Sequence, residues 1–316
     1  MTRKHVFGLS GCLLLALVAA IGLYTSGASS ALGLNRKVVD RIPPTLPQAI
    51  TSDALSSDAT TLKILLFSKT AGFRHAEAIP ACRRSVKRIA KRRGWEVFAT
   101  ENAAVFNSEQ LAHFNVIFGN NSSGDNWTKK QKQAFIEYIE GGGGFVGVHG
   151  VGGTRQRFWG WYNDVLLRAL FIGHPMFPQF QQATVQVEDS SHPAMQHLPR
   201  QWRRKDEWYS FEQSPRKLGV RVLARLDESS YDAVRFSRDL RMGDHPIIWS
   251  HCVAERGRVF YSALGHLREA YEDPLHEAML EGAIEWAAGL KGECSAPGSA
   301  GSTPGGTKGK AEELPE

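Results

Sequence analysis

The sequence predicts an α/β fold built on a mostly parallel sheet with helices on both faces. Two observations lead to this prediction. Short apolar runs alternate with amphipathic helical patterns, and histidines follow two of the apolar runs. Such alternation is typical of doubly wound sheets, which bind ligands at the carboxyl ends of their strands. With 316 residues, 42% hydrophobic and 22% charged, the chain has an ordinary globular composition.

The first half of the chain contains four predicted strands. The run 62–67 is continuously apolar, as expected for a strand buried on both faces. A helix over 78–93 follows, with Gly94 at the position that C-caps favour. A capping box of Thr128 and Gln131 starts another helix, which ends near residue 140. The other predicted elements are strands at 95–99, 114–118 and 145–148 and a short helix near 108–113.

The second half has longer loops between its predicted strands, which we place at 184–187, 220–226, 247–251 and 259–264. Asp273 and Pro274 start a final helix that runs to about residue 290, because proline is favoured in the first turn. Residues 61–290 therefore form one predicted domain. Residues 32–60 are a predicted linker, and 291–316 are predicted to be a disordered tail.

The N-terminus has the layout of an export signal. Arg3 and Lys4 precede an apolar run over 6–24, and small residues are frequent over 26–31. The run is about 19 residues long, which is also enough to span a bilayer as an uncleaved anchor. We therefore expect residues 1–31 to be a signal peptide or a membrane anchor. The domain is then exported and is periplasmic, extracellular or held at the membrane.

Three cysteines lie beyond this segment, namely Cys82, Cys252 and Cys294. An oxidising compartment would allow one disulfide, but the sequence does not select a pair, and isolated buried thiols are the alternative. No C-x-x-C pair is present, so we do not expect a zinc site made of thiolates.

Much of the net charge of +6 lies in the predicted helix over 78–93. Apolar residues recur there at helical spacing, which places the basic residues on the solvent face of an amphipathic helix. Attraction to anionic lipid or nucleic acid is the alternative. No aromatic residues interleave the basic ones, so we do not expect a nucleic-acid partner.

Two histidines follow predicted strands at the points where the strands end. Residues 142–150 read GGGFVGVHG, and His149 stands where a nucleophile elbow would carry Cys or Ser. The run 258–264 ends in Gly265 and His266. Because the carboxyl ends of parallel strands meet at one edge of a sheet, we expect both imidazoles to lie in one pocket.

Imidazole nitrogens suit zinc and related divalent ions. His75 and His174 also lie near predicted strand ends, so folding could bring all four histidines together. We expect His149 and His266 to be ligands if a metal such as zinc is bound. A polar pocket without metal is the alternative, because no H-x-x-x-H or H-E-x-x-H pair is present.

The segment 206–209 reads DEWY and combines two carboxylates with two aromatic rings. Carboxylates accept hydrogen bonds from sugar hydroxyls, and aromatic faces pack on sugar C–H surfaces. The alternative is a pair of core aromatics beside a surface charge pair. Asn120, after the third strand, is expected at the rim of the pocket. The predicted catalytic residues are His149, Glu207 and His266, and the predicted substrate-binding residues are His75, Asn120, His174, Asp206, Tyr209 and Tyr261.

Several of these segments together resemble the ThuA-like (trehalose utilisation) family over about residues 62–290. They are FSKTAGFRH at 67–75, GGGFVGVHG at 142–150, GHP at 173–175, DEWY at 206–209, DESSY at 227–231, GDHPI at 243–247, GRVFY at 257–261 and LGH at 264–266. The resemblance implies a class I glutamine amidotransferase-like fold with flavodoxin-like layering.

In true amidotransferases of this superfamily the elbow carries Cys and a later strand end carries His. His149 takes the first position and His266 the second, so the resemblance implies that glutaminase activity is absent. The segment after His149 also departs from the family. It usually continues with Ala and Thr-Asp, whereas this chain has GVGGT at 150–154.

These observations favour an exported enzyme that acts on a sugar or glycoside, with metal assistance as one option. The resemblance implies a substrate such as a trehalose-type or oxidised disaccharide. A non-catalytic carbohydrate-binding or interaction domain is the alternative function. A hydrolase of the amidohydrolase or protease type is disfavoured, because the nucleophile is missing.

We predict that residues 1–31 direct export. The full-length chain, expressed with a C-terminal tag, should fractionate with the membrane or the exported proteins, and the chain lacking 1–31 should stay in the cytoplasm. Cleavage near 26–31 would identify a secreted form, and an intact membrane-bound chain an anchored one. Full-length chain found soluble in the cytoplasm would contradict the prediction.

Overall fold

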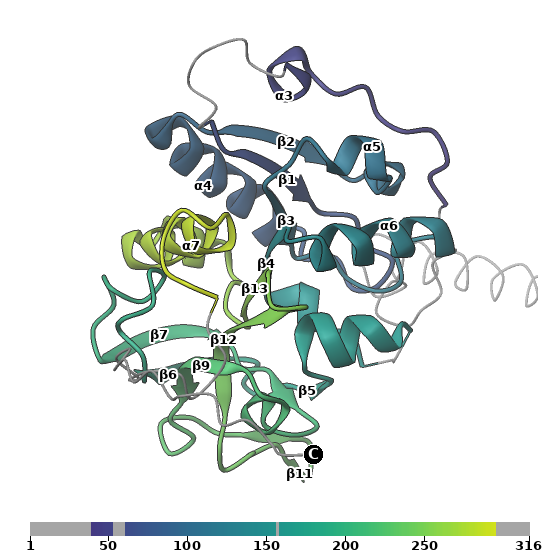
Figure 1. Ribbon diagram of the computed structural model, residues 1–316. Helices are drawn as coiled ribbons and strands as arrows, with labels where there is room; N and C mark the ends of the chain where they lie inside the picture. The colour runs from purple at the N-terminus through teal and green to yellow at the C-terminus, as the bar shows by residue number, and fades with distance from the viewer. Residues whose placement is uncertain (1–38, 53–60, 156–157, 295–316) are drawn as a thin grey trace, which may run out of the picture.

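The computed structural model describes residues 39–52, 61–155 and 158–294. A nine-stranded sheet forms the centre of the molecule (Figure 1). Its strands lie in the order β2 (Glu96–Thr100), β1 (Lys63–Phe67), β3 (Val116–Asn120), β4 (Gly144–Val148), β13 (Gly257–Ser262), β12 (Pro246–Val253), β9 (Arg221–Leu226), β6 (Phe180–Val187) and β7 (Gln201–Glu207).

The sheet is mixed, and the predicted α/β fold is confirmed. Strands β2, β1, β3, β4 and β13 are parallel, and β12, β9, β6 and β7 extend them with antiparallel pairs. β12 is antiparallel to both β13 and β9, and β6 is antiparallel to both β9 and β7. The strands β13, β9 and β7 therefore run in one direction, and their carboxyl ends lie at the same edge of the sheet as the end of β4.

Helices cover both faces of the parallel half of the sheet (Figure 1). One side carries α4 (Ala78–Arg93) and α7 (Pro274–Ala287), and the other carries α5 (Ser108–Leu111) and α6 (Lys129–Glu140). The predicted caps are present. Gly94 ends α4 with a φ of 69°, Thr128 and Gln131 form the capping box of α6, and Asp273 accepts a hydrogen bond at the start of α7.

The remaining elements are short. They are α3 (Gln48–Thr51), η1 (Ala103–Val105), η2 (His149–Gly152), η3 (Tyr162–Leu167), η4 (Pro215–Leu218), η5 (Arg268–Glu272), β5 (Phe171–Gly173), β8 (Ser210–Phe211), β10 (Val234–Arg235) and β11 (Arg238–Asp239). The pairs β5–β8 and β10–β11 lie outside the main sheet. No helix of the described residues combines the length and the apolar character that crossing a membrane requires.

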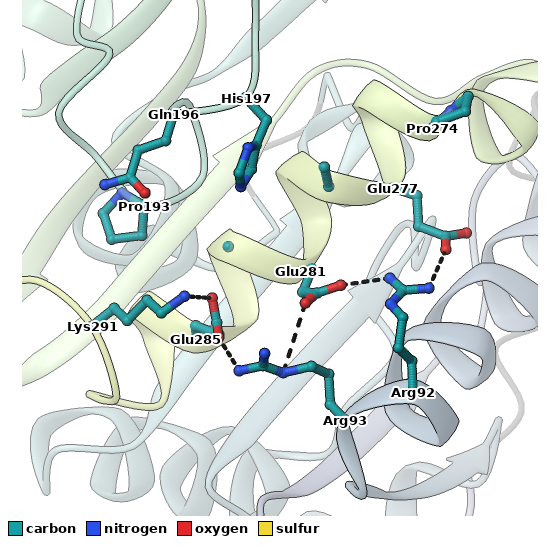
Figure 2. A pocket seen from close by; sticks show the side chains of 12 residues that line it. Arg92, Arg93, Pro193, Gln196, His197, Pro274, Glu277, Glu281, Glu285 and Lys291 are labelled. Carbon is teal, nitrogen blue, oxygen red and sulfur yellow. Dashed lines mark hydrogen bonds and ion pairs between the residues drawn. The ribbon is translucent and has the colours of Figure 1, made fainter.

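Part of the basic face of α4 pairs with α7. Figure 2 shows Arg92 and Arg93 against the glutamates of α7, with Arg92 Nη1 lying 3.0 Å from Glu277 Oε1. Arg93 contacts Glu281 and Glu285. The charged side chains that line this groove of about 430 Å³ are thus paired with one another. Such exposed pairs contribute at most about 1 kcal/mol each.

Residues on both sides of the predicted domain in the sequence contact the domain. Residues 39–52, which we expected to belong to a linker, contact the domain through Asp40, whose carboxylate accepts from the Ala103 N–H at 2.8 Å. At the other flank, Cys294 forms a disulfide with Cys252, with a Cα–Cα distance of 5.8 Å. The predicted export segment, most of the predicted tail and the remainder of the predicted linker lie outside the described residues.

Three buried histidines outside the pocket predict acid sensitivity. Burial lowers the pKa of His192, His251 and His276 to about 3. In the unfolded chain each protonates near pH 6.5, so the stability contributed by the neutral folded form is complete above that pH and is lost as pH falls toward 3. We expect the free energy of unfolding to fall by up to about 1.4 kcal/mol per pH unit per histidine.

Urea unfolding between pH 7 and pH 4 measures this slope. His276→Asn keeps a donor for the Ala270 carbonyl, which His276 Nδ1 contacts at 2.6 Å, and should make the slope shallower. His197→Asn, at an exposed position, is the matched control. Equal slopes in the wild type and His276→Asn would contradict the prediction.

Candidate functional site

His149 lies at the carboxyl end of β4, at a sharp turn that the sequence pattern predicted. Its φ of 41° is in the left-handed region, and its side chain is fully buried. Nδ1 lies 2.7 Å from the carbonyl oxygen of Ala263. A carbonyl can only accept, so the proton is on Nδ1 and Nε2 carries a lone pair. The Tyr261 hydroxyl donates to the His149 carbonyl at 2.9 Å, which stabilises the turn.

His266 follows β13 and is held by a carboxylate from β7. Asp206 is fully buried and accepts hydrogen bonds from the backbone N–H groups of Gly265, at 2.8 Å, and His266, at 3.0 Å. It also accepts from the N–H of its neighbour Glu207 at 3.0 Å. The end of β7 is therefore tied to the loop after β13, and Glu207 and His266 meet as a consequence.

Three ligand-type atoms face one another at nearly equal distances. His149 Nε2 lies 3.1 Å from His266 Nδ1 and 3.3 Å from Glu207 Oε2, and His266 Nδ1 lies 3.1 Å from Glu207 Oε2. His75 adds a fourth group, and the four ligand atoms all lie within 4.8 Å of one another. We call His75, His149, Glu207 and His266 the histidine–glutamate cluster.

His75 enters this cluster through a space that only glycine leaves open. A Cβ on Gly150 would lie 3.0 Å from two ring atoms of His75. His75 Nδ1 is buried and has no hydrogen-bond partner among the described residues. A buried nitrogen without a partner is costly, and a metal ion or a bound ligand would satisfy it.

The geometry of the cluster fits a divalent transition metal. Two ligands that each lie about 2.0–2.1 Å from one zinc ion are about 3.3 Å apart in a tetrahedral site. The separations of 3.1–3.3 Å in the triangle of His149, Glu207 and His266 match this value. The Ala263 carbonyl fixes the His149 tautomer that leaves Nε2 free, which is the usual support of a metal-bound imidazole.

The electrostatics of the cluster also favour a cation. With the proton of His149 on Nδ1, Nε2 of His149 and Oε2 of Glu207 present lone pairs to each other at 3.3 Å, and a metal ion between them would satisfy both. Burial alone would raise the pKa of Glu207, but the hydrogen bonds and positive charge that His149 and His266 supply when they are protonated outweigh it and keep the pKa well below its ordinary value. Burial and the charges of the neighbouring histidines hold the pKa of His75 well below its usual value. A carboxylate and a neutral imidazole are the forms that bind metals.

A cavity of about 550 Å³ opens onto the cluster at the carboxyl edge of the sheet. Tyr209 forms one wall and stacks on His149 with a ring separation of 4.2 Å. His174 Nε2 lies 3.3 Å from Glu207 Oε1, and Gln179 donates to the same oxygen. Aromatic and hydrogen-bonding side chains therefore share the cavity wall.

The structure brings six of the predicted site residues together at one cavity, and their roles stay predictions. They are His75, His149, His174, Glu207, Tyr209 and His266. Asn120, Asp206 and Tyr261, which we expected to contact substrate, are fully buried and do not line the cavity. Asn120 donates to the Ile79 carbonyl at 2.9 Å, while Asp206 and Tyr261 position the two histidine turns.

Several cavity residues were not predicted from the sequence, among them Gln179, Arg155 and Arg235. Gln179 precedes β6, Arg155 lies after the elbow, and Arg235 lies in the short strand β10. Each lies in a loop or a two-residue strand, where neither periodicity nor spacing indicates function.

Fold and site together define an α/β protein that has replaced the elbow nucleophile by an imidazole in a cluster suited to metal binding. A family model described as ThuA, trehalose utilisation, matches residues 63–287. The chain belongs to this family.

Solved structures of two ThuA-like proteins are similar to the chain. The protein from Bacteroides uniformis shares 26% identity at a TM-score of 0.62, covering 72% of this chain and 91% of its own. The protein from Parabacteroides merdae shares 18% identity at a TM-score of 0.56, covering 73% and 91%. A search of curated proteins found no significant match.

The backbone at the elbow argues against glutaminase chemistry a second time. In nucleophile elbows the N–H of the residue after the nucleophile stabilises the oxyanion. Here that N–H belongs to Gly150 and donates to Asn121 Oδ1 at 3.3 Å. Both the nucleophile and this oxyanion donor are therefore absent from the site.

We predict that the purified chain releases no ammonia from glutamine above the rate of a buffer blank. His149→Ala should be equally inactive, because no nucleophile is removed. A coupled ammonia assay with an authentic glutaminase as positive control measures this. Ammonia release that persists through repurification and disappears in His149→Ala would show the prediction to be wrong.

Proposed function

We propose that the histidine–glutamate cluster binds one divalent transition metal, zinc in the first place, and that the chain is an enzyme acting on a sugar or glycoside at this site. The observation that carries the proposal is the approach of four ligand atoms to within 4.8 Å of one another at an open cavity. Three imidazoles and one carboxylate are an ordinary ligand set for zinc.

A carbohydrate substrate is supported by the cavity wall and by the family. Tyr209 and Phe73 offer aromatic surface, and His174 and Gln179 offer polar groups. Sugars need both kinds of contact, for hydroxyl groups and for C–H faces. The volume of about 550 Å³ lies within the range of small-molecule sites. The family name refers to the use of trehalose, a disaccharide.

The chemistry available at the site is acid–base and electrostatic. A bound metal would polarise a substrate oxygen or lower the pKa of a bound water. His174 stands beside Glu207 on the cavity wall and can hydrogen-bond to a hydroxyl group that enters. Elimination or hydrolysis of a glycosidic bond needs such a proton donor or acceptor.

An exported location is supported by two features. The layout of residues 1–31 is typical of export segments. The disulfide between Cys252 and Cys294 is of a kind that persists in oxidising compartments.

The metal prediction is tested on the full chain after chelation and dialysis. Zinc titration should reach one equivalent per chain. His149→Ala and Glu207→Gln should weaken zinc affinity by about a hundredfold or more, because each removes one of the proposed ligands. His197→Ala, at an exposed position remote from the cavity, is the control. Zinc affinity that is equal in all four proteins would contradict the proposal.

The sugar part is tested on the same samples, with and without zinc. Trehalose and an oxidised disaccharide should raise the melting temperature of the zinc-loaded wild type and should be converted in overnight reactions followed by chromatography. Binding without conversion would identify a non-catalytic carbohydrate-binding domain instead. Absence of both would exclude these sugars as ligands and refute the proposed substrate class.

A further inference from the structure

Two arginines line the cavity beside the histidine–glutamate cluster, and no carboxylate of the described residues pairs with either. Arg155 and Arg235 both line the cavity wall. Within the described part of the chain neither forms an ion pair, whereas arginines elsewhere on the surface, such as Arg74 and Arg216, pair with one or two carboxylates. Two unpaired guanidinium groups thus share one cavity.

Arg235 is held against the wall and does not extend freely into solvent. Its Nη1 and Cδ atoms lie 3.4 Å from the position that a Cβ on Gly173 would occupy. Gly173 has a φ of 155°, which side-chain-bearing residues rarely adopt, so the space beside the guanidinium is preserved. The Arg235 guanidinium lies 5.7 Å from the ring centre of Phe236. Its Nε is buried without a hydrogen-bond partner among the described residues.

The acidic residues of the cavity do not neutralise these arginines. Glu207 is engaged by the histidine cluster and by Gln179. Asp125 lies 3.0 Å from Lys132 Nζ and is paired there. Burial and the positive charges of Arg155 and Arg238 lower the pKa of Arg235 and outweigh the opposite effect of Glu207. A divalent metal in the cluster would add further positive charge.

We propose that the substrate of this site is a sugar that carries a negative charge, a carboxylate or a phosphate, and that Arg235 and Arg155 bind this group. The inference rests on the proposed metal-bearing carbohydrate site and names its substrate class. The planar fork of a guanidinium binds carboxylate and phosphate oxygens in pairs. A neutral sugar that covered the partly buried Arg235 guanidinium would remove water from it without supplying a charged partner, which is unfavourable. The anionic group therefore lies at the arginines, and the hydroxyl groups lie toward the cluster.

Calorimetric titration of the zinc-loaded full chain with matched probes tests this. The pairs are lactobionate with lactose, glucuronate with glucose, and glucose 6-phosphate with glucose. We expect at least one anionic probe to bind about tenfold or more tightly than its neutral partner, and its affinity to fall as sodium chloride is raised. The pair that shows the preference distinguishes a carboxylate from a phosphate.

Variants localise the effect. Arg235→Gln and Arg155→Gln should each lower affinity for the anionic probe by about tenfold and leave that for the neutral partner within about twofold. Arg256→Gln, at an exposed position between β12 and β13 and not part of the cavity wall, should behave as wild type. Equal binding of both members of every pair, or equal losses for both in Arg235→Gln, would overturn the inference. The zinc content of each sample separates this failure from failure of the metal site.

Discussion

The site depends on one carboxylate, that of Asp206, which binds the backbone N–H groups of Gly265 and His266. β7 and β13 are four positions apart in the sheet, which is about 19 Å if the sheet is flat. The two strands are nevertheless joined, because the loop after β13 donates buried hydrogen bonds to Asp206. Because Glu207 is the next residue, the same hydrogen bonds place its carboxylate beside His266. Without them the cluster would be divided between two ends of the sheet.

A second constraint is the sharp turn at His149. A left-handed residue at a strand end places its side chain over the sheet edge, and in this chain the side chain is an imidazole. The Ala263 carbonyl accepts a hydrogen bond from Nδ1–H, so the opposite nitrogen presents its lone pair to His266 and Glu207. The Gly150 N–H, which would serve an oxyanion, bonds to Asn121 instead. The same turn that suits a nucleophile is therefore adapted here to hold a metal ligand or a proton acceptor.

The sequence allowed the parallel half of the fold and most of the cluster to be predicted, because both follow from strand ends. Apolar runs and caps locate strands, and strand ends locate His149 and His266. The sequence did not show which of two adjacent carboxylates reaches the cavity. Asp206 lies beneath the cavity and binds backbone N–H groups, whereas Glu207, the next residue, lines the cavity. β7 was not predicted as a strand, because the buried Arg204 interrupts its apolar pattern. Of the two carboxylates that contact Arg204, one is on the same strand and the other, that of Asp273, comes from a distant segment. The position of Arg235 in the cavity could not be predicted, because it lies in a two-residue strand that has no recognisable sequence pattern.

The central claim is that imidazoles from three separate segments, with Glu207, surround one metal ion. X-ray absorption spectroscopy of the zinc-loaded chain tests it directly. The account predicts a first shell of nitrogen and oxygen at about 2.0–2.1 Å, no sulfur, and outer-shell scattering from three imidazoles. His75→Ala should reduce the imidazole count by one. A zinc spectrum without imidazole scattering, or one with a sulfur ligand, would contradict the account.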